Sequence, residues 1–194
     1  MAAPPLLLVR PAAVSDGEQA TSTLEELYDR HADYVHQALR RLGVPRASLP
    51  DALQDVFVIV HRHLSQLDPS GSPKPWLFVL AMGVARNHRR RLRRKPEVEP
   101  GAVDPDKVGG RFEEPFERAA HAERVELFYK LLEAMDDDKR AVFVLAELEE
   151  LTVPEIATIL GLNLNTAYAR LRAARQRFEL SLSRLRAREQ GRIA

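Results

Sequence analysis

The sequence predicts an all-α protein made of two small helical domains that are joined by a flexible acidic linker. Apolar residues recur at helical spacing over most of the 194 residues, and two Thr/Glu pairs, each three residues apart, mark expected helix starts. Residues 96–116 are instead rich in proline, glycine and acidic side chains and show no periodicity. The chain therefore divides into five parts: a flexible extension (1–22), a first helical domain (23–95), the linker (96–116), a second helical domain (117–188) and a tail (189–194).

Charge is unevenly distributed along the chain, although the formal net charge is only +1. Basic residues crowd into Arg86–Lys95 and Arg170–Arg192, so local fields matter more than the sum. The absence of cysteine excludes disulfides, thiol catalysis and cysteine–zinc sites. The apolar run within Pro4–Val9 is too short for a signal-peptide core or a membrane span. We therefore expect a cytoplasmic protein that does not insert into a membrane.

Two amphipathic helices are expected to open the first domain. Thr23 and Glu26 form a capping box, and the helix that they start ends at Gly43. Ser48 with Asp51 starts the second helix, whose apolar face recurs every three or four residues. The two helices therefore present matching apolar stripes to a common core.

The polar face of this second helix carries Asp51, Gln54 and Asp55. Two carboxylates on one face could act as general acid and base. Acidic side chains near a helix N-terminus are, however, expected from the helix dipole alone. No histidine, serine or lysine is obviously poised beside them, so we do not expect catalysis here.

A loop and a strongly basic helix complete the first domain. Asp68–Pro75 is dense in turn-forming residues and is expected to be the loop, with Trp76 directly after it. A tryptophan in this position most often anchors a core, but beside a cationic stripe it could also stack on an unpaired base. Like charges at i, i+3 and i+4 repel one another, and a polyanion would relieve this repulsion. The basic residues of the run are Arg86, Arg89, Arg90, Arg91, Arg93, Arg94 and Lys95.

In the second domain, a helix is expected to resume near Glu117, and Asp136 or Asp137 caps the next one. The stretch Leu151–Arg177 then predicts a helix-turn-helix, with a capping box of Thr152 and Glu155 at its start. Its turn and the N-cap of its second helix are supplied by Gly161 and Asn163. The outward face of that second helix carries Asn165, Tyr168, Ala169, Arg172 and Arg175.

Such a helix, small on its inner side and polar or cationic outside, is typical of a recognition helix in a DNA major groove. A helical hairpin in an ordinary bundle would show much the same pattern. The chain contains no Gly-rich phosphate loop, nucleophile elbow or HExxH motif, and its six histidines are scattered. We therefore expect neither an enzyme nor a bound metal or cofactor.

Three motifs together resemble the bacterial sigma-70 family, specifically the small extracytoplasmic-function (group IV) sigma factors that keep only regions 2 and 4. The resemblance covers roughly Leu24 to Leu185. The segment Asp51–Val60 is similar to region 2.2, Pro75–Arg94 is similar to region 2.3 running into 2.4, and Met135–Arg175 is similar to region 4. Each motif is moderately specific, whereas all three in this order and spacing are strongly so.

The resemblance implies a dissociable promoter-specificity subunit of RNA polymerase that also assists promoter melting. It implies that the acidic linker threads the RNA exit path. From the exposed faces of regions 2 and 4 we expect that an anti-sigma factor could hold the two domains together and occlude both, whereas a docking helix from the linker or tail could instead make regulation internal. Docking on the clamp helices of the largest polymerase subunit would use Asp51, Gln54 and Asp55. Contacts to the minus-10 element would come from Trp76, Arg86, Asn87, Arg89, Arg90 and Arg93. Minus-35 bases would be read by Asn165, Tyr168, Ala169 and Arg172, with phosphates held by Thr166, Arg170 and Arg175.

Two other functions are compatible with parts of the pattern. A helix-turn-helix regulator that acts without polymerase would use only the C-terminal domain and would leave Asp51–Lys95 unexplained. A sigma mimic that sequesters an anti-sigma factor would never touch DNA, and the arginines of the expected recognition helix argue against it.

Overall fold

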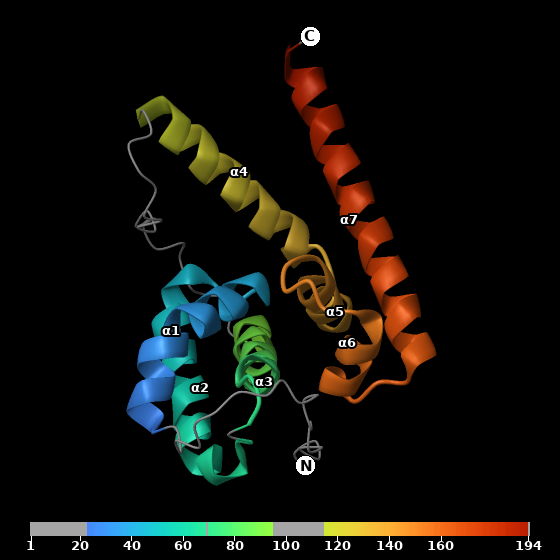
Figure 1. Ribbon diagram of the computed structural model, residues 1–194. Helices are drawn as coiled ribbons and strands as arrows, with labels where there is room; N and C mark the ends of the chain where they lie inside the picture. Colours follow the sequence, from blue (N-terminus) through green and yellow to red (C-terminus); the bar gives the residue numbers. More distant parts are fainter. Residues whose placement is uncertain (1–22, 69, 95–114, 194) are drawn as a thin grey trace.

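The computed structural model describes residues 23–68, 70–94 and 115–193, and every regular element within these ranges is a helix (Figure 1). The all-α prediction is therefore confirmed. The extension 1–22 and nearly all of the expected linker lie outside the described residues.

The first helical unit is a bundle of three helices in which each packs against the other two. The helices are α1 (Leu24–Arg41), α2 (Leu49–His63) and α3 (Lys74–Arg94), with short 3-10 turns at Arg46–Ser48 and Leu64–Gln66. Val35, Leu39, Val56, Val60 and Phe78 are fully buried in its core. This core exists because the apolar stripes expected from the sequence face one another.

The ends of α1 follow the prediction. The Glu26 N–H donates to the Thr23 hydroxyl at 3.2 Å, and the Thr23 N–H donates to the Glu26 carboxylate at 3.1 Å, which completes the capping box. Gly43 follows the helix with φ +87°, a conformation that glycine adopts without strain. A methyl group at Gly43 would in addition collide with the guanidinium of Arg140.

The starts of α2 and α3 differ from the prediction. Ser48 occupies the N-cap of α2 but makes no capping bond with its side chain, because the chain enters α2 directly from a 3-10 turn. The loop expected over Asp68–Pro75 is shorter, since α3 begins at Lys74 and Pro75 lies in its first turn, where a missing N–H is tolerated. Trp76 is therefore inside the helix, half-buried and packed against the core.

The second helical unit contains α4 (Pro115–Glu133), α5 (Asp137–Glu147), α6 (Val153–Leu160) and α7 (Leu164–Ile193). The helix expected near Glu117 begins at Pro115, because proline is well suited to a first helical position. Asp136 is the N-cap of α5, and its carboxylate accepts from the Lys139 N–H at 2.9 Å. The predicted tail 189–194 continues α7 through Ile193, so α7 extends well beyond the rest of the unit (Figure 1).

Arg140 in α5 is fully buried, although its place in a charged segment does not indicate burial. Its guanidinium donates to the carbonyls of Leu132 (2.7 Å), Glu133 (3.1 Å) and Met135 (2.8 Å) at the end of α4, and to that of Leu42 (2.7 Å) after α1. Burial, followed by repulsion from Arg89, lowers the pKa of Arg140 to about 10, so it stays charged at neutral pH. One buried cation therefore satisfies helix-end carbonyls from both units.

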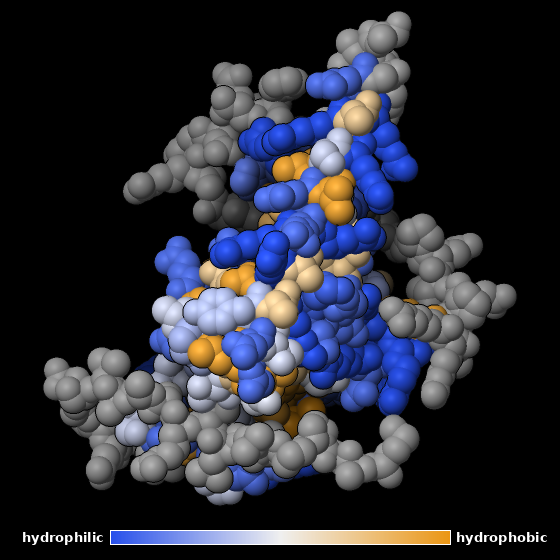
Figure 2. Space-filling view, turned by 90° about the vertical axis from the view of Figure 1, so that its right-hand side faces the viewer, coloured by the Kyte–Doolittle hydropathy of each residue, from blue (hydrophilic) through white to orange (hydrophobic). Residues whose placement is uncertain are grey.

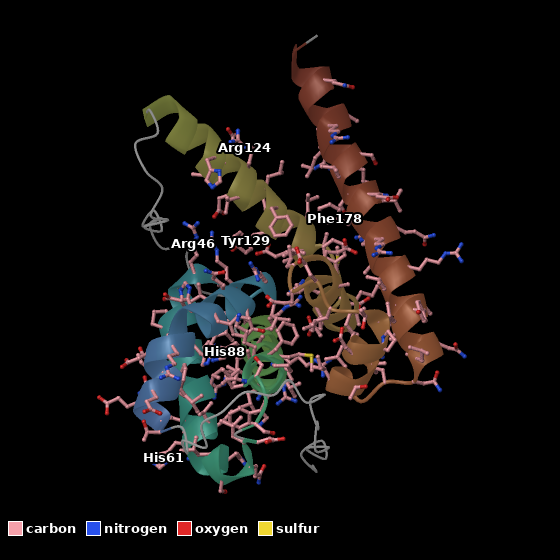
Figure 3. The ribbon with its side chains drawn as sticks, in the orientation of Figure 1. Arg46, His61, His88, Arg124, Tyr129 and Phe178 are labelled. Atoms are coloured by element: carbon pink, nitrogen blue, oxygen red, sulfur yellow. The ribbon has the colours of Figure 1, made fainter. Side chains whose placement is uncertain are left out.

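The two helical units pack against each other in this structure. Glu126 of α4 pairs with Arg40 at 2.8 Å and with Arg46, and Arg41 pairs with Glu149 at 2.7 Å. The Arg40 guanidinium lies 3.9 Å from the centre of the Tyr129 ring, and Figure 3 shows Tyr129 and Arg46 on the two sides of this junction. Buried apolar residues of both units also belong to one continuous cluster.

Candidate polymerase and DNA interfaces

The polar face of α2 is exposed as predicted, with Asp51, Gln54 and Asp55 all accessible. Asp55 is nevertheless not isolated, because its carboxylate lies 3.0 Å from Nε2 of His88 in α3. The statement that no histidine lies beside these carboxylates is therefore wrong for Asp55. His88 is buried and lies within the first helical unit (Figure 3), so the pair joins α2 to α3 and fixes the Asp55 side chain at the rim of the face.

An open hollow lies between α2 and α3 next to this pair. Asp55 and Val58 line it from α2, and Asn87, Arg90 and Arg91 line it from α3. The expected polymerase-binding face and part of the expected minus-10 face therefore adjoin. Asn87 and Arg90 are exposed as predicted, whereas the Arg93 side chain lies outside the described part.

The arginines of α3 differ in what they contact. Arg86 pairs with Asp138 and Arg89 pairs with Asp137, two aspartates in the first turn of α5. Arg90 directly follows Arg89 in the sequence but is exposed to solvent. The basic run is thus partly neutralised by the second helical unit, an arrangement that sequence spacing alone does not reveal.

The helix-turn-helix has the local structure that the sequence predicts. Both the N–H (2.8 Å) and the hydroxyl (2.6 Å) of Thr152 donate to the Glu155 carboxylate, and these bonds lower the pKa of Glu155. Gly161 ends α6 with φ +61°, and the Asn163 side chain accepts from the Asn165 N–H at 2.9 Å to cap α7. Ala167, Leu171 and Ala174 are buried on the inner side of α7.

The outer side of α7 presents the expected base-reading residues to solvent. Asn165, Thr166, Tyr168, Ala169 and Arg172 are all exposed, Tyr168 to 54%. Figure 2 faces this side of the molecule and shows a mostly hydrophilic surface with separate hydrophobic spots. The helix therefore offers a face with hydrogen-bonding groups, one exposed aromatic ring and one small side chain, as base readout in a major groove requires.

Two residues expected to meet phosphates are engaged elsewhere. Arg170 pairs with Asp138 at 2.9 Å, and Arg175 pairs with Glu147 at 2.7 Å. Asp138 consequently contacts an arginine from α3 and an arginine from α7 at once. The described residues contain no cluster of metal-ligating side chains, and none of their helices is long and apolar enough to cross a membrane.

Comparison with known proteins relates both helical units to one family. Residues 27–95 match the family Sigma-70 region 2, and residues 126–178 match Sigma-70, region 4. RNA polymerase sigma factor CnrH of Cupriavidus metallidurans is 31% identical over 163 residues, which cover 81% of this chain and 85% of CnrH. The ECF RNA polymerase sigma-E factor of Escherichia coli is 27% identical over 169 residues, covering 84% and 87% of the two chains.

Solved structures agree with this relationship. CnrH in complex with the cytosolic domain of CnrY superposes with a TM-score of 0.58 at 26% identity, over 82% of this chain and 87% of CnrH. The sigma factor RpoE in complex with the anti-sigma factor NepR, from Bartonella quintana, has a TM-score of 0.60 over 82% and 96% of the chains; at 18% identity it supports the fold alone.

The chain belongs to the sigma-70 family of RNA polymerase sigma factors. Within that family it is an extracytoplasmic-function sigma factor; the region 2 match runs from α1 through α3, and the region 4 match runs from α4 into α7. Its role is accordingly to give RNA polymerase its promoter specificity in transcription initiation.

Proposed function

We propose that this sigma factor works through three surfaces of its own: the α2 face docks on core polymerase, α3 holds the minus-10 element, and α7 reads the minus-35 element. The observation that carries the proposal is the outer face of α7. There Asn165, Tyr168 and Arg172 are exposed on a helix whose start is capped by Asn163, two residues after the Gly161 turn that ends α6. A rigid, exposed and hydrogen-bonding helix face is what direct base readout requires.

On α7, base contact and phosphate contact fall on different residues. Arg172 would donate to a base edge, and Tyr168 and Ala169 would make apolar contacts beside it. Val153, Tyr168 and Leu171 border an open hollow next to Arg172, which offers room for a group such as a thymine methyl. Thr166, Arg170 and Arg175 would hold the flanking phosphates and so fix the register of the helix on the duplex.

On α3, the exposed positions suit a melted strand. Asn87 and Arg90 would contact its backbone together with Arg86, Arg89 and Arg93. Trp76 is half-buried at the start of the same helix, so part of its ring remains accessible to an unpaired base while the rest anchors the core.

The α2 face would bind the clamp helices of the largest polymerase subunit through Asp51, Gln54 and Asp55. Acidic and amide groups on a rigid helix can pair with a basic partner, which raises the association rate and sets the register. His88 would act as a positioning residue, because it holds Asp55 without being exposed itself. The same face is a surface that an anti-sigma factor could cover, and we propose that such a partner regulates this chain in the cytoplasm, where the polymerase works.

A charge reversal on α2 tests the docking surface. We expect Asp51→Lys to weaken binding to core polymerase about tenfold, because it places a cation against a basic partner. Binding can be measured by fluorescence anisotropy of the labelled full chain titrated with core polymerase. Asp33→Lys, an equally exposed acidic position on α1, is the matched control and should leave the affinity within twofold. Equal effects of the two variants would contradict the assignment of the α2 face.

A further inference from the structure

The aspartates at the start of α5 pair with arginines that we assign to DNA phosphates. Asp137 pairs with Arg89, and Asp138 pairs with both Arg86 and Arg170. These three arginines come from the two elements that we assign to DNA, α3 and α7. A carboxylate in this position makes the same charge-assisted hydrogen bonds to a guanidinium that a phosphate oxygen makes.

The position of Asp138 is incompatible with simultaneous contact to both promoter elements. Arg86 and Arg170 meet on the two oxygens of one carboxylate, so their guanidinium groups lie within a few ångströms of each other. Elements centred at minus-10 and minus-35 are about 25 base pairs apart, which is roughly 85 Å along B-form DNA. The two helical units must therefore separate before the chain can hold a promoter.

The contacts that keep the units together are suited to reversal. The pairs of Asp138 with Arg86 and Arg170 are partly exposed, with side-chain exposures of 31–44%. Pairs of this kind are individually weak and are screened by salt.

We propose that Asp137 and Asp138 form an internal competitor for DNA, which keeps the free sigma factor in a closed state with its phosphate-binding arginines neutralised. Binding of core polymerase or of DNA would then have to displace these two carboxylates. The proposal rests on the assignment of Arg86, Arg89 and Arg170 to DNA. It goes beyond that assignment by naming, within the same chain, what these arginines contact before DNA arrives.

The test compares the DNA affinity of full-length variants without polymerase. The probe is a labelled 25-nucleotide single strand of mixed sequence, followed by fluorescence anisotropy at several salt concentrations. For Asp137→Asn/Asp138→Asn we expect about tenfold tighter binding, and a slope of log affinity against log salt that is steeper by about 1.4, as two further phosphate contacts on a single strand require. The control Asp29→Asn/Asp33→Asn changes the net charge equally at exposed positions of α1.

The aspartate substitutions also remove the acidic side chains from the first turn of α5, so a second variant weakens the junction at a different place. Glu126→Gln removes a carboxylate that pairs with Arg40 and Arg46 elsewhere on the junction, and Glu126 pairs with none of the DNA-assigned arginines in the described residues. We expect Glu126→Gln to tighten DNA binding as well. The chain contains no cysteine, so spin labels can be attached at Gln66→Cys and Arg186→Cys. The distance between the two labels should become longer and more broadly distributed in the Glu126 variant and in the Asp137/Asp138 variant. If neither variant binds DNA more tightly than the Asp29/Asp33 control, the proposal is overturned.

The proposed DNA contacts are tested separately from the internal competitor. Arg86→Ala/Arg89→Ala in the holoenzyme should reduce promoter-dependent transcription, and in the Asp137→Asn/Asp138→Asn background it should cancel the gain in DNA affinity. A loss of transcription without any effect of the aspartate variants would leave the DNA assignment intact and reject the competitor. A gain in affinity that survives removal of the two arginines would also reject it, because other cations would then be responsible.

Discussion

Replacing Arg140 by methionine is expected to lower the free energy of unfolding by about 3 kcal/mol or more, the largest stability effect that we predict for a single side chain. Methionine fills a similar volume but donates no hydrogen bond. The carbonyls of Leu42, Leu132, Glu133 and Met135 would lose the guanidinium as a donor, and three of the four lost hydrogen bonds are buried. Of these carbonyls, that of Leu132 keeps the Met135 N–H as a donor at 3.1 Å. An unsatisfied buried carbonyl costs about 1–3 kcal/mol. The methionine variant no longer has to bury a charge, but this gain offsets only part of the cost of the unsatisfied carbonyls.

Urea unfolding followed by circular dichroism measures this effect. Arg140→Lys is the informative control, because it keeps the charge but lacks the planar guanidinium whose donors reach all four carbonyls. We expect the lysine variant to lie between the wild type and the methionine variant. A methionine variant as stable as the wild type would show that the helix-end carbonyls are satisfied by other means.

Replacing Arg172 by alanine is expected to reduce promoter-dependent transcription about tenfold or more while leaving stability nearly unchanged. Arg172 is exposed on the outer face of α7 and makes no ion pair with any residue that the structure describes, so its removal costs the fold little. A well-placed arginine contact to a base is worth about 1–3 kcal/mol of discrimination. Transcription with saturating core polymerase on the cognate promoter reports this loss.

Arg184→Ala is the matched control for Arg172→Ala, since Arg184 is equally exposed on the same helix but lies beyond the region 4 match. It should transcribe within twofold of the wild type. Unchanged transcription by the Arg172 variant would contradict the assignment of Arg172 to the minus-35 element.

The local features of the fold could be predicted from the sequence because their causes are local. The Thr23/Glu26 capping box, the turn at Gly161 and the cap at Asn163 each depend on residues within a few positions of one another. The outward face of α7 follows equally from helical periodicity. For the same reason, the expected base-reading residues Asn165, Tyr168 and Arg172 are all exposed.

The contacts between distant parts of the chain could not be predicted. Arg140 belongs to a charged segment at the start of α5, where periodicity gives no sign that its guanidinium is buried against the end of α1. The pairing of His88 with Asp55 spans 33 positions, and that of Arg89 with Asp137 spans 48. Single-sequence periodicity describes faces of helices but not which faces meet, so the neutralisation of the basic run is visible only in three dimensions.

Reconstituted transcription tests the central claim most directly. Start-site mapping in cells that overproduce this chain would define its promoter, and purified chain would then be added to core polymerase on that template. We predict a run-off transcript from the mapped start that requires the chain and is lost when either the minus-10 or the minus-35 element is scrambled. Core polymerase that gives no promoter-dependent transcript with this chain, although the chain alone binds the same DNA tightly, would contradict the account and favour a regulator that acts without polymerase docking.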